Sequence, residues 1–216
     1  GGEDAGTGEL VRLAETLGAP VLDGWHGDYL NFPRDHALYA GVAVEPVHDL
    51  LKEADFILLA EAVAAWHPAS ALRGTKVAAL GEDPLHSRLP FWGFRADYLL
   101  AGDAELTLRE LVKAVADPEE TLEQSEARRA SRKHLWLMKH DWPKRKSELA
   151  ARARASADGA VITAAWAAHE LNEVLPADAI LVNETISHRG DICRLMDRLK
   201  PGAFIEASYG GLGMGL

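Results

Sequence analysis

The sequence predicts an α/β protein with a mostly parallel sheet, followed by a long helical linker and a partial second α/β unit. Short aliphatic runs alternate with amphipathic stretches at helical spacing, an order typical of parallel strands covered by helices. A charge-rich stretch interrupts this alternation before it resumes. We therefore expect a first unit over 1–118, a basic helical linker over 119–156 and a second unit over 157–216.

Local patterns predict the elements of the first unit. Its short apolar runs are predicted strands, at 19–22, 55–60, 75–80 and 96–101. Its stretches with apolar residues on one face are predicted helices, at 7–18, 45–54 and 104–116. Gly18 is expected to end the first helix, and Asp103 to cap the last one. Turn residues between aromatic ones predict a long loop over 23–43, with at most one short helix.

The linker is expected to be helical over 119–155, with an interruption before Pro143. Residues 128–154 contain ten Lys and Arg against two Asp and Glu, although the whole chain has a formal net charge of −10. Such a strip can bind nucleic acid, or it can be a solvated helix near an acidic surface. The acidic body and the lack of a nucleic-acid motif favour the second interpretation. Trp136 and Trp142 would then pack the linker onto a neighbouring surface.

The second unit is predicted to contain helices over 160–174 and 187–199 around a buried strand over 179–182. Ser187 stands where a helix N-cap is expected. A glycine-rich tail follows over 209–216, and its lack of any terminating signal is typical of a sequence cut within a pattern.

Composition excludes several classes of protein. No apolar run approaches the ~20 residues of a membrane span, and no secretory signal opens the chain. The single cysteine, Cys193, excludes a disulfide framework, is compatible with a cytoplasmic location and is expected to be an inert core thiol. The nine histidines lack metal-binding spacing. We therefore expect no metal site in this chain, and neither a membrane nor a nucleic acid as partner.

A candidate binding segment follows the predicted strand over 179–182. Ligands of open α/β sheets gather at the carboxyl ends of strands, and the first turn of a helix offers backbone N–H groups that suit a phosphate. Thr185 and Ser187 add hydroxyl donors here. The glycines of the tail would let a ligand approach the backbone closely. The alternatives are an N-cap serine without a ligand and a flexible chain end.

These two segments, N-E-T-I-S-H at 183–188 and S-Y-G-G-L-G-M-G-L at 208–216, resemble the start of the diphosphate-binding domain of thiamine diphosphate-dependent enzymes. The acetolactate synthase and benzoylformate decarboxylase group has the most similar motifs. Residues 1–118 resemble the Rossmann-like central domain of that family through "LAETLGAPV", "ADFILLA", "GEDP" and "ADYLLAGDAELTL", with the first strand of that domain missing. The stretch 119–156 would connect the two domains.

The resemblance implies roles for eight residues. The strand-end segment would contact the cofactor diphosphate, with Ser187 as the best hydroxyl donor and His188 as a second candidate. The carbonyl group of Gly210 would accept a hydrogen bond from the aminopyrimidine, and Leu212 would hold the cofactor bent. The implied cofactor-binding set is Glu184, Thr185, Ile186, Ser187, His188, Gly210, Gly211 and Leu212.

The resemblance also implies an activity. The parent enzyme would decarboxylate a 2-oxo acid, or join it to a second carbonyl compound, with thiamine diphosphate as electron sink and Mg²⁺ as its metal. The family's G-D-G metal motif and its activating glutamate have no counterpart in residues 1–216. The chain is therefore interpreted as an inactive internal fragment of a homo-oligomeric enzyme. The segment 61–70 lacks the arginine motif of FAD-binding relatives, which argues against FAD.

Three other functions are consistent with the sequence. A non-catalytic assembly module would bind no ligand through residues 1–116, and a nucleotide-binding α/β protein would be stabilised by ADP or FAD. A nucleic-acid-binding protein would show salt-dependent binding that is lost when residues 128–154 are neutralised.

Overall fold

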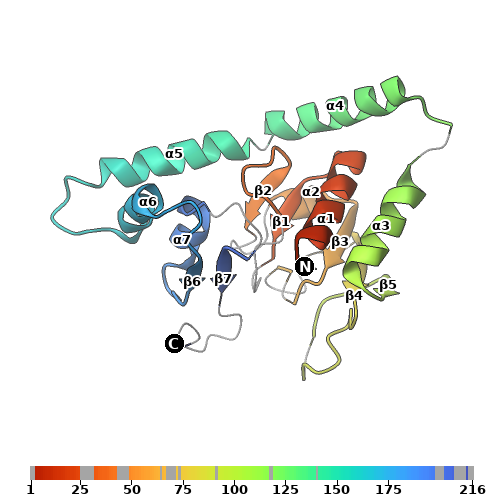
Figure 1. Ribbon diagram of the computed structural model, residues 1–216, viewed down its shortest axis with the longest axis horizontal. Coiled ribbons are helices and arrows are strands. Elements are labelled where there is room, and N and C mark those ends of the chain that lie inside the picture. The colour runs from red at the N-terminus through yellow and green to blue at the C-terminus, as the bar shows by residue number, and fades with distance from the viewer. Residues whose placement is uncertain are drawn as a thin grey trace.

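The computed structural model confirms the α/β fold, and every described pair of strands is parallel (Figure 1). The structure describes residues 3–24, 32–42, 49–63, 65–66, 72, 74–90, 92–116, 119–139, 141–197, 202–206 and 213. The described strands are β1 (Val21–Asp23), β2 (Tyr39–Val42), β3 (Phe56–Ala60), β4 (Lys76–Gly81), β5 (Tyr98–Ala101), β6 (Leu181–Asn183) and β7 (Phe204–Glu206). The described helices are α1 (Glu3–Leu17), α2 (Asp49–Glu53), α3 (Ala104–Val115), α4 (Leu122–Lys139), α5 (Trp142–Ala155), α6 (Ala164–Val174) and α7 (Arg189–Leu195).

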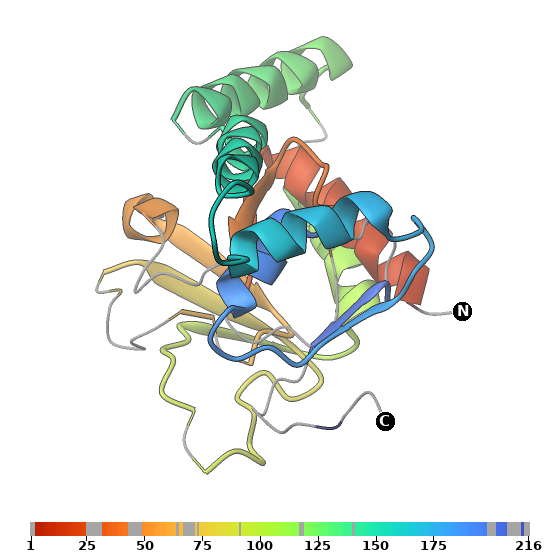
Figure 2. The ribbon, with the colours of Figure 1, turned by 90° about the vertical axis from the view of Figure 1, so that its left-hand side faces the viewer.

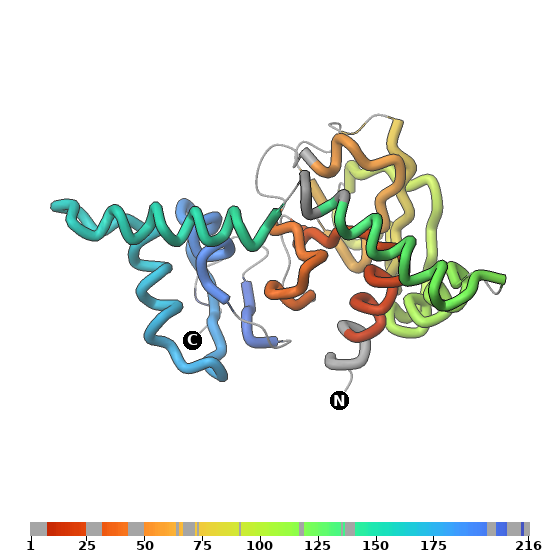
Figure 3. Tube along the Cα trace, turned by 90° about the horizontal axis from the view of Figure 1, so that it is seen from above, coloured from red at the N-terminus to blue at the C-terminus, as the bar shows by residue number. Residues whose placement is uncertain are grey.

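The described strands form three small sheets, β1–β2, β3–β4–β5 and β6–β7. The first two sheets lie in the expected first unit and the third lies in the expected second unit. The linker forms the two helices α4 and α5, of which α4 lies over the first unit and α5 over the second (Figures 1 and 3). Figure 2 shows α6 packed below α5. A small core of Val42, Cys193 and Phe204 is shared by both units.

Several helix ends lie where local sequence signals predict them. Asp103 caps α3, since its carboxylate accepts a hydrogen bond from the Leu106 N–H at 2.9 Å. Gly18, with φ of 63°, ends α1 as expected. Asp141 caps α5, and Pro143 stands in its first turn, which explains the break in the linker.

The two linker tryptophans pack as predicted. Trp136 of α4 is buried against Phe32 and Tyr39, and the Trp142 ring of α5 meets the Tyr39 ring edge to face at 5.6 Å. Arg132 of α4 donates a hydrogen bond to the carbonyl oxygen of Leu17 at 2.6 Å, which satisfies an open acceptor at the end of α1. The linker is therefore fixed to the first unit by both apolar and polar contacts.

The prediction of a long loop over 23–43 is wrong at its end, because residues 39–42 form β2. This strand is buried along its whole length and pairs with β1. Gly41 has φ of 99°, and a Cβ atom there would lie 2.9 Å from the Trp142 ring, so only glycine leaves room for the indole. The strand β2 has four residues, one of them glycine, which is too short for an alternation of apolar and polar residues to be recognised. Its position depends instead on the long-range contact with Trp142.

The helix predicted over 187–199 is also shorter, because α7 ends at Leu195 and Met196 is extended. The N–H of Asp197 instead donates to the side-chain oxygen of Asn172 at 2.6 Å, a tertiary contact that competes with helical bonding. Ser187 is not the N-cap. His188 holds that position, and its side chain makes no capping hydrogen bond.

Other boundaries differ by a few residues. The second unit's first helix starts at Ala164 because Thr163 caps it, and its strand is displaced to 181–183. The strand β7, for which the sequence offered no signal, pairs with β6. The predicted start of the helix over 45–54 lies outside the described residues, which contain α2 from Asp49.

Candidate functional site

The candidate site is the turn between β6 and α7, and Asn183 determines its shape. Asn183 is the last residue of β6 and is buried. Its side-chain oxygen accepts hydrogen bonds from both the backbone N–H and the hydroxyl of Thr185, at 3.2 and 2.7 Å. These bonds close a local Asx turn that starts the segment Glu184–His188. The hydroxyl of Thr185 is therefore directed at Asn183.

A buried ion pair lies directly behind this turn. Glu206 stands opposite Asn183 in the β6–β7 register, and its carboxylate accepts a hydrogen bond from the Asn183 amide at 2.8 Å. Arg189, the first residue of α7, donates two further hydrogen bonds to the same carboxylate at 2.6 and 2.5 Å. Two-point pairing of this kind fixes orientation as well as charge. Glu206 thus connects the strand end to the start of α7.

The same cluster affects Cys193. Its sulfur lies 3.9 Å from the Glu206 carboxylate and the residue is buried. Burial, together with the negative charge of Glu206, raises the pKa of this thiol to about 11. The prediction of an inert core thiol is consistent with this environment.

Three of the predicted residues of the turn, Ile186, Ser187 and His188, are exposed. Ile186 is 68% exposed, and the side chains of Ser187 and His188 also face solvent. The hydroxyl of Ser187 and the ring of His188 are therefore accessible to a ligand at the start of α7. The only acidic residue in the first turn of α7, Asp191, lies 3.6 Å from the ring of His188.

One contact brings the glycine-rich tail to this turn. The backbone N–H of Gly213 donates a hydrogen bond to the Glu184 carboxylate at 2.7 Å. Gly210, Gly211 and Leu212, the other predicted site residues of the tail, lie outside the described residues.

A second buried ionic cluster joins the two units. The Asp23 carboxylate accepts hydrogen bonds from the Tyr39 hydroxyl at 2.9 Å and from the Arg34 guanidinium at 3.3 and 3.4 Å. Arg34 also donates to the carbonyl oxygen of Met196 in the second unit, at 3.3 Å. Burial raises the pKa of Asp23, and the positive charge of Arg34 opposes that rise. This cluster positions the candidate site relative to the first unit.

Sequence reasoning found the turn but missed the residues that hold it. Asn183 stands at a strand end, where an Asx turn is a recognisable signal. Arg189 and Glu206 gave no such signal, since the register of β6 and β7 that places Glu206 behind the turn is not a local property. Arg34 and Asp23 were likewise hidden in a segment interpreted as loop.

The donor set of the turn fits a diphosphate in part. An accessible hydroxyl and a helix N-terminus are suitable partners for phosphate, whereas Glu184 and Asp191 add negative charge. Within the described parts of the chain, no group of three or more His, Cys, Asp or Glu side chains could hold a metal ion. Among the helices that the structure describes, none is both long enough and apolar enough to cross a membrane.

Comparison with solved structures identifies enzymes with the same arrangement of elements. A protein from Mycobacterium smegmatis, described as a candidate thiamin diphosphate-dependent enzyme, aligns with 98% of this chain at a TM-score of 0.66 and 22% identity. The thiamine diphosphate-dependent 4-hydroxybenzoylformate decarboxylase of Rhodococcus jostii RHA1 aligns with 97% (TM-score 0.62, 22% identity). Benzoylformate decarboxylase of Polynucleobacter necessarius aligns with 95% (TM-score 0.65, 19% identity).

The likeness covers 38%, 36% and 35% of those three chains, so the present chain spans little more than a third of their length. At these identities the likeness establishes the fold. No family model and no curated protein matches the sequence.

Proposed function

We propose that this chain supplies a central unit, 1–118, a linker, 119–156, and the start of a cofactor-binding unit, 157–216, to a thiamine diphosphate- and magnesium-dependent enzyme. That enzyme acts on 2-oxo acids by decarboxylation, by carboligation as in acetolactate synthase, or by both. The fold likeness to two decarboxylases over 95% or more of the chain supports this proposal. The isolated chain is inactive, because it contributes binding residues without a catalytic group.

The main observation in support of this proposal is the hydrogen bond between Glu184 and Gly213. It joins the turn at the end of β6 to the glycine-rich tail, 29 residues further along the chain. The family resemblance assigns cofactor contacts to these two segments and to no other part of the chain. Their meeting at one place is what a single ligand that touches both of them requires.

The turn residues have distinct tasks in this proposal. Ser187 and His188, both exposed, hold the diphosphate, while Asn183 and Thr185 keep the turn in shape. Bound thiamine diphosphate supplies an electron sink for the carbanion that decarboxylation produces. The Gly210 carbonyl orients the aminopyrimidine, and Leu212 keeps the cofactor bent. Gly211 allows close backbone approach.

Magnesium is proposed to be held by residues that are not among these 216. FAD is not part of the proposal, because segment 61–70 lacks the arginine motif. The enzyme is proposed to be a cytoplasmic homo-oligomer. Exposed apolar side chains in the second unit, which would be covered by further protein, support assembly: Val161, Ile162, Val174, Ile180 and Ile186.

The test uses the complete product of the reading frame that encodes this chain. With thiamine diphosphate and Mg²⁺, it should release CO₂ from at least one of a panel of 2-oxo acids that includes benzoylformate and pyruvate. Omission of thiamine diphosphate should abolish the reaction, and the 216-residue chain should release no CO₂. If the complete product neither binds thiamine diphosphate nor decarboxylates any member of the panel, the proposal is wrong.

A matched pair of serine variants tests the assigned site. Ser187→Ala removes the proposed diphosphate donor and should raise the Kd for thiamine diphosphate about 10- to 150-fold, the range of one charge-assisted hydrogen bond. Ser131→Ala removes an exposed serine of α4 and should leave that Kd unchanged. Equal effects of the two substitutions on the Kd would mean that Ser187 does not bind the diphosphate.

A further inference from the structure

A cavity of about 280 Å³ lies where the linker meets both units. Its lining comes from three elements that pack against one another, namely β2 of the first unit, α5 of the linker and α7 of the second unit. Figures 1 and 3 show the start of α5 beside β2. Ala40 and Val42 line the cavity from β2, and Arg194 lines it from α7. We call it the linker cavity.

One face of α5 supplies the remaining wall. Trp142, Arg145, Leu149 and Arg152 all line the cavity, and they follow one another at intervals of three and four residues. Residues at these intervals lie on the same side of a helix. The linker cavity therefore combines apolar side chains with cationic ones.

The charges around the linker cavity are mostly of one sign. Its lining contains the guanidinium groups of Arg145, Arg152 and Arg194 and a single carboxylate, that of Glu148, which gives a net charge of +2. Neither Arg145 nor Arg152 forms an ion pair with any residue in the described ranges of the chain. A concave site that gathers one sign of charge attracts small ions of the opposite sign.

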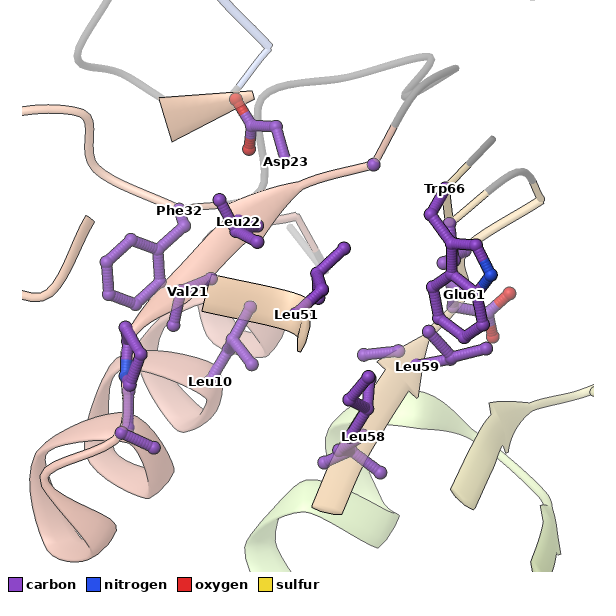
Figure 4. Close-up of a pocket in the computed structure, with 18 of the residues that line it drawn as sticks. Leu10, Val21, Leu22, Asp23, Phe32, Leu51, Leu58, Leu59, Glu61 and Trp66 are labelled. Atoms are coloured by element: carbon purple, nitrogen blue, oxygen red, sulfur yellow. The ribbon is translucent and has the colours of Figure 1, made fainter. Parts of the chain in front are cut away.

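The larger cavity of the described chain, of about 1010 Å³, differs in its charge. It lies between β1 and β3, and its labelled lining residues in Figure 4 are apolar apart from two acids, Asp23 and Glu61. The family resemblance would place the missing first strand of the central domain in this space, so we assign no ligand to it.

We propose that the linker cavity binds a small phosphate monoester with an apolar body, and that this ligand links the two units. A phosphate monoester carries a charge of about −1.5 to −2 at pH 7, which matches the +2 of the lining. Guanidinium groups bind phosphate oxygens in pairs, and they are weakly hydrated. The volume is just below the ~300–1,000 Å³ of small-molecule pockets, so the body is a single ring or a short chain.

The ligand would connect elements of both units. It would contact β2 on one side and Arg194 of α7 on the other. The helix α7 begins at Arg189, which pairs with Glu206 behind the candidate site. Binding should therefore stabilise the present arrangement of β2, α5 and α7. The inference does not rest on the proposed cofactor, because the residues of the linker cavity are not those of the turn.

The first test measures binding of phenyl phosphate to the complete product of the reading frame that encodes this chain. Calorimetry in about 0.15 M salt, which screens loose association of ions, should give a Kd of about 1 mM or lower. Benzenesulfonate has the same ring and a similar head with one charge instead of two, so it should bind about fivefold more weakly or worse. Inorganic phosphate, which has no apolar body, should also bind more weakly. No binding of phenyl phosphate, or equal affinity for benzenesulfonate, would overturn the proposal.

A matched pair of arginine variants locates the site. Arg152→Gln removes a cation of the linker cavity and should raise the Kd for phenyl phosphate about tenfold or more. Arg154→Gln removes the same charge from another face of α5 and should change that Kd less than about twofold. Equal effects would mean loose attraction to the basic linker, and the linker cavity would be rejected.

Ser187→Ala separates this inference from the proposed cofactor site. If phenyl phosphate occupied the turn at the start of α7, this variant would weaken its binding and Arg152→Gln would not. Binding in the linker cavity predicts the opposite result. That result would stand even if the complete product bound no thiamine diphosphate.

Hydrogen exchange tests the link between the units. Saturating phenyl phosphate should slow exchange about threefold or more in peptides that cover β2 and in peptides that cover α7. Peptides from α3, which does not line the cavity, should exchange at the same rate with and without the ligand. Slower exchange in α5 alone would mean that the ligand does not join the two units, and that part of the proposal would be wrong.

Discussion

The guanidinium of Arg34 lies 4.5 Å from the centre of the Phe204 ring, so a cation of the first unit stacks on an aromatic residue of the second. The same side chain forms an ion pair with Asp23 and donates to the Met196 carbonyl. Because Arg34 is buried, these contacts are screened little by solvent. Arg34 is therefore the principal polar connection between the two units among the described residues.

Arg34→Met should lower the free energy of unfolding by about 3–5 kcal/mol, because the substitution leaves the Asp23 carboxylate buried without its cation. Urea denaturation measures this change. The loss should shrink toward acidic pH, where Asp23, whose pKa burial already raises, takes up a proton. Lys113→Met, at an exposed ion pair with Glu110, is the control and should change stability little. Similar losses of stability for the two variants would contradict the role of Arg34 as a buried connection between the two units.

Gly18→Ala should destabilise the chain, since it places a side chain at φ of 63° and 2.8 Å from the Cβ of Arg132. The backbone cost alone is about 1–2 kcal/mol, and the hydrogen bond between Arg132 and Leu17 would be disturbed as well. Gly8→Ala has the same chemistry inside α1, where no atom lies within 4 Å of the new Cβ. It should stabilise by about 0.5–1 kcal/mol. Thermal unfolding should therefore shift in opposite directions for the two variants, and a shift in the same direction would refute the analysis.

Elements with local sequence signals were predicted from the sequence, and elements that depend on distant contacts were not. The helix α3 and the strands β3 and β4 were predicted because caps and continuous apolar runs are local signals. The strands β2 and β7 were not predicted, because neither stands out as a continuous aliphatic run and each is defined by its pairing with another strand. For the candidate site, strand-end reasoning located the turn around Thr185. It could not find Glu206, which reaches the turn only through the pairing of β6 with β7.

The Cys193 thiol should react slowly with disulfide reagents in the folded chain. Its pKa of about 11, against an ordinary 9.0, reduces the thiolate fraction at pH 8 about 100-fold, and burial limits access further. The rate with 5,5′-dithiobis(2-nitrobenzoate) in buffer should be compared with the rate in 6 M urea. The pH profile in buffer should still be rising at pH 10. A plateau near pH 9 would contradict the raised pKa.

The same shift has a consequence for stability. Between about pH 9 and 11 the unfolded chain loses the thiol proton while the folded chain keeps it. The free energy of unfolding should therefore decrease as pH rises through this range, by about 2–3 kcal/mol in total. Cys193→Ala should remove this part of the pH dependence.

Glu206→Gln should cost about 3–5 kcal/mol, because it replaces the buried carboxylate that pairs with Arg189 by a neutral amide. It should also loosen the turn that Asn183 shapes, so exchange of the Thr185 amide should accelerate. The same substitution at Glu110, whose ion pair with Lys113 is exposed, should have little effect on either quantity. If exchange of the Thr185 amide were unchanged in Glu206→Gln, the ion pair between Arg189 and Glu206 would not stabilise the turn.

Both units meet one short stretch of α5. Trp142 packs on Tyr39 of the first unit, and four residues later Lys146 forms an ion pair with Asp197 of the second. Four residues are about one helical turn, or roughly 6 Å of rise, so both contacts lie on the same face of α5. Insertion of a single residue between them would rotate one contact by about 100° away from its unit. The start of α5 thus sets the spacing and rotation of the two units, and over evolutionary time this turn should accept substitutions but not changes in length.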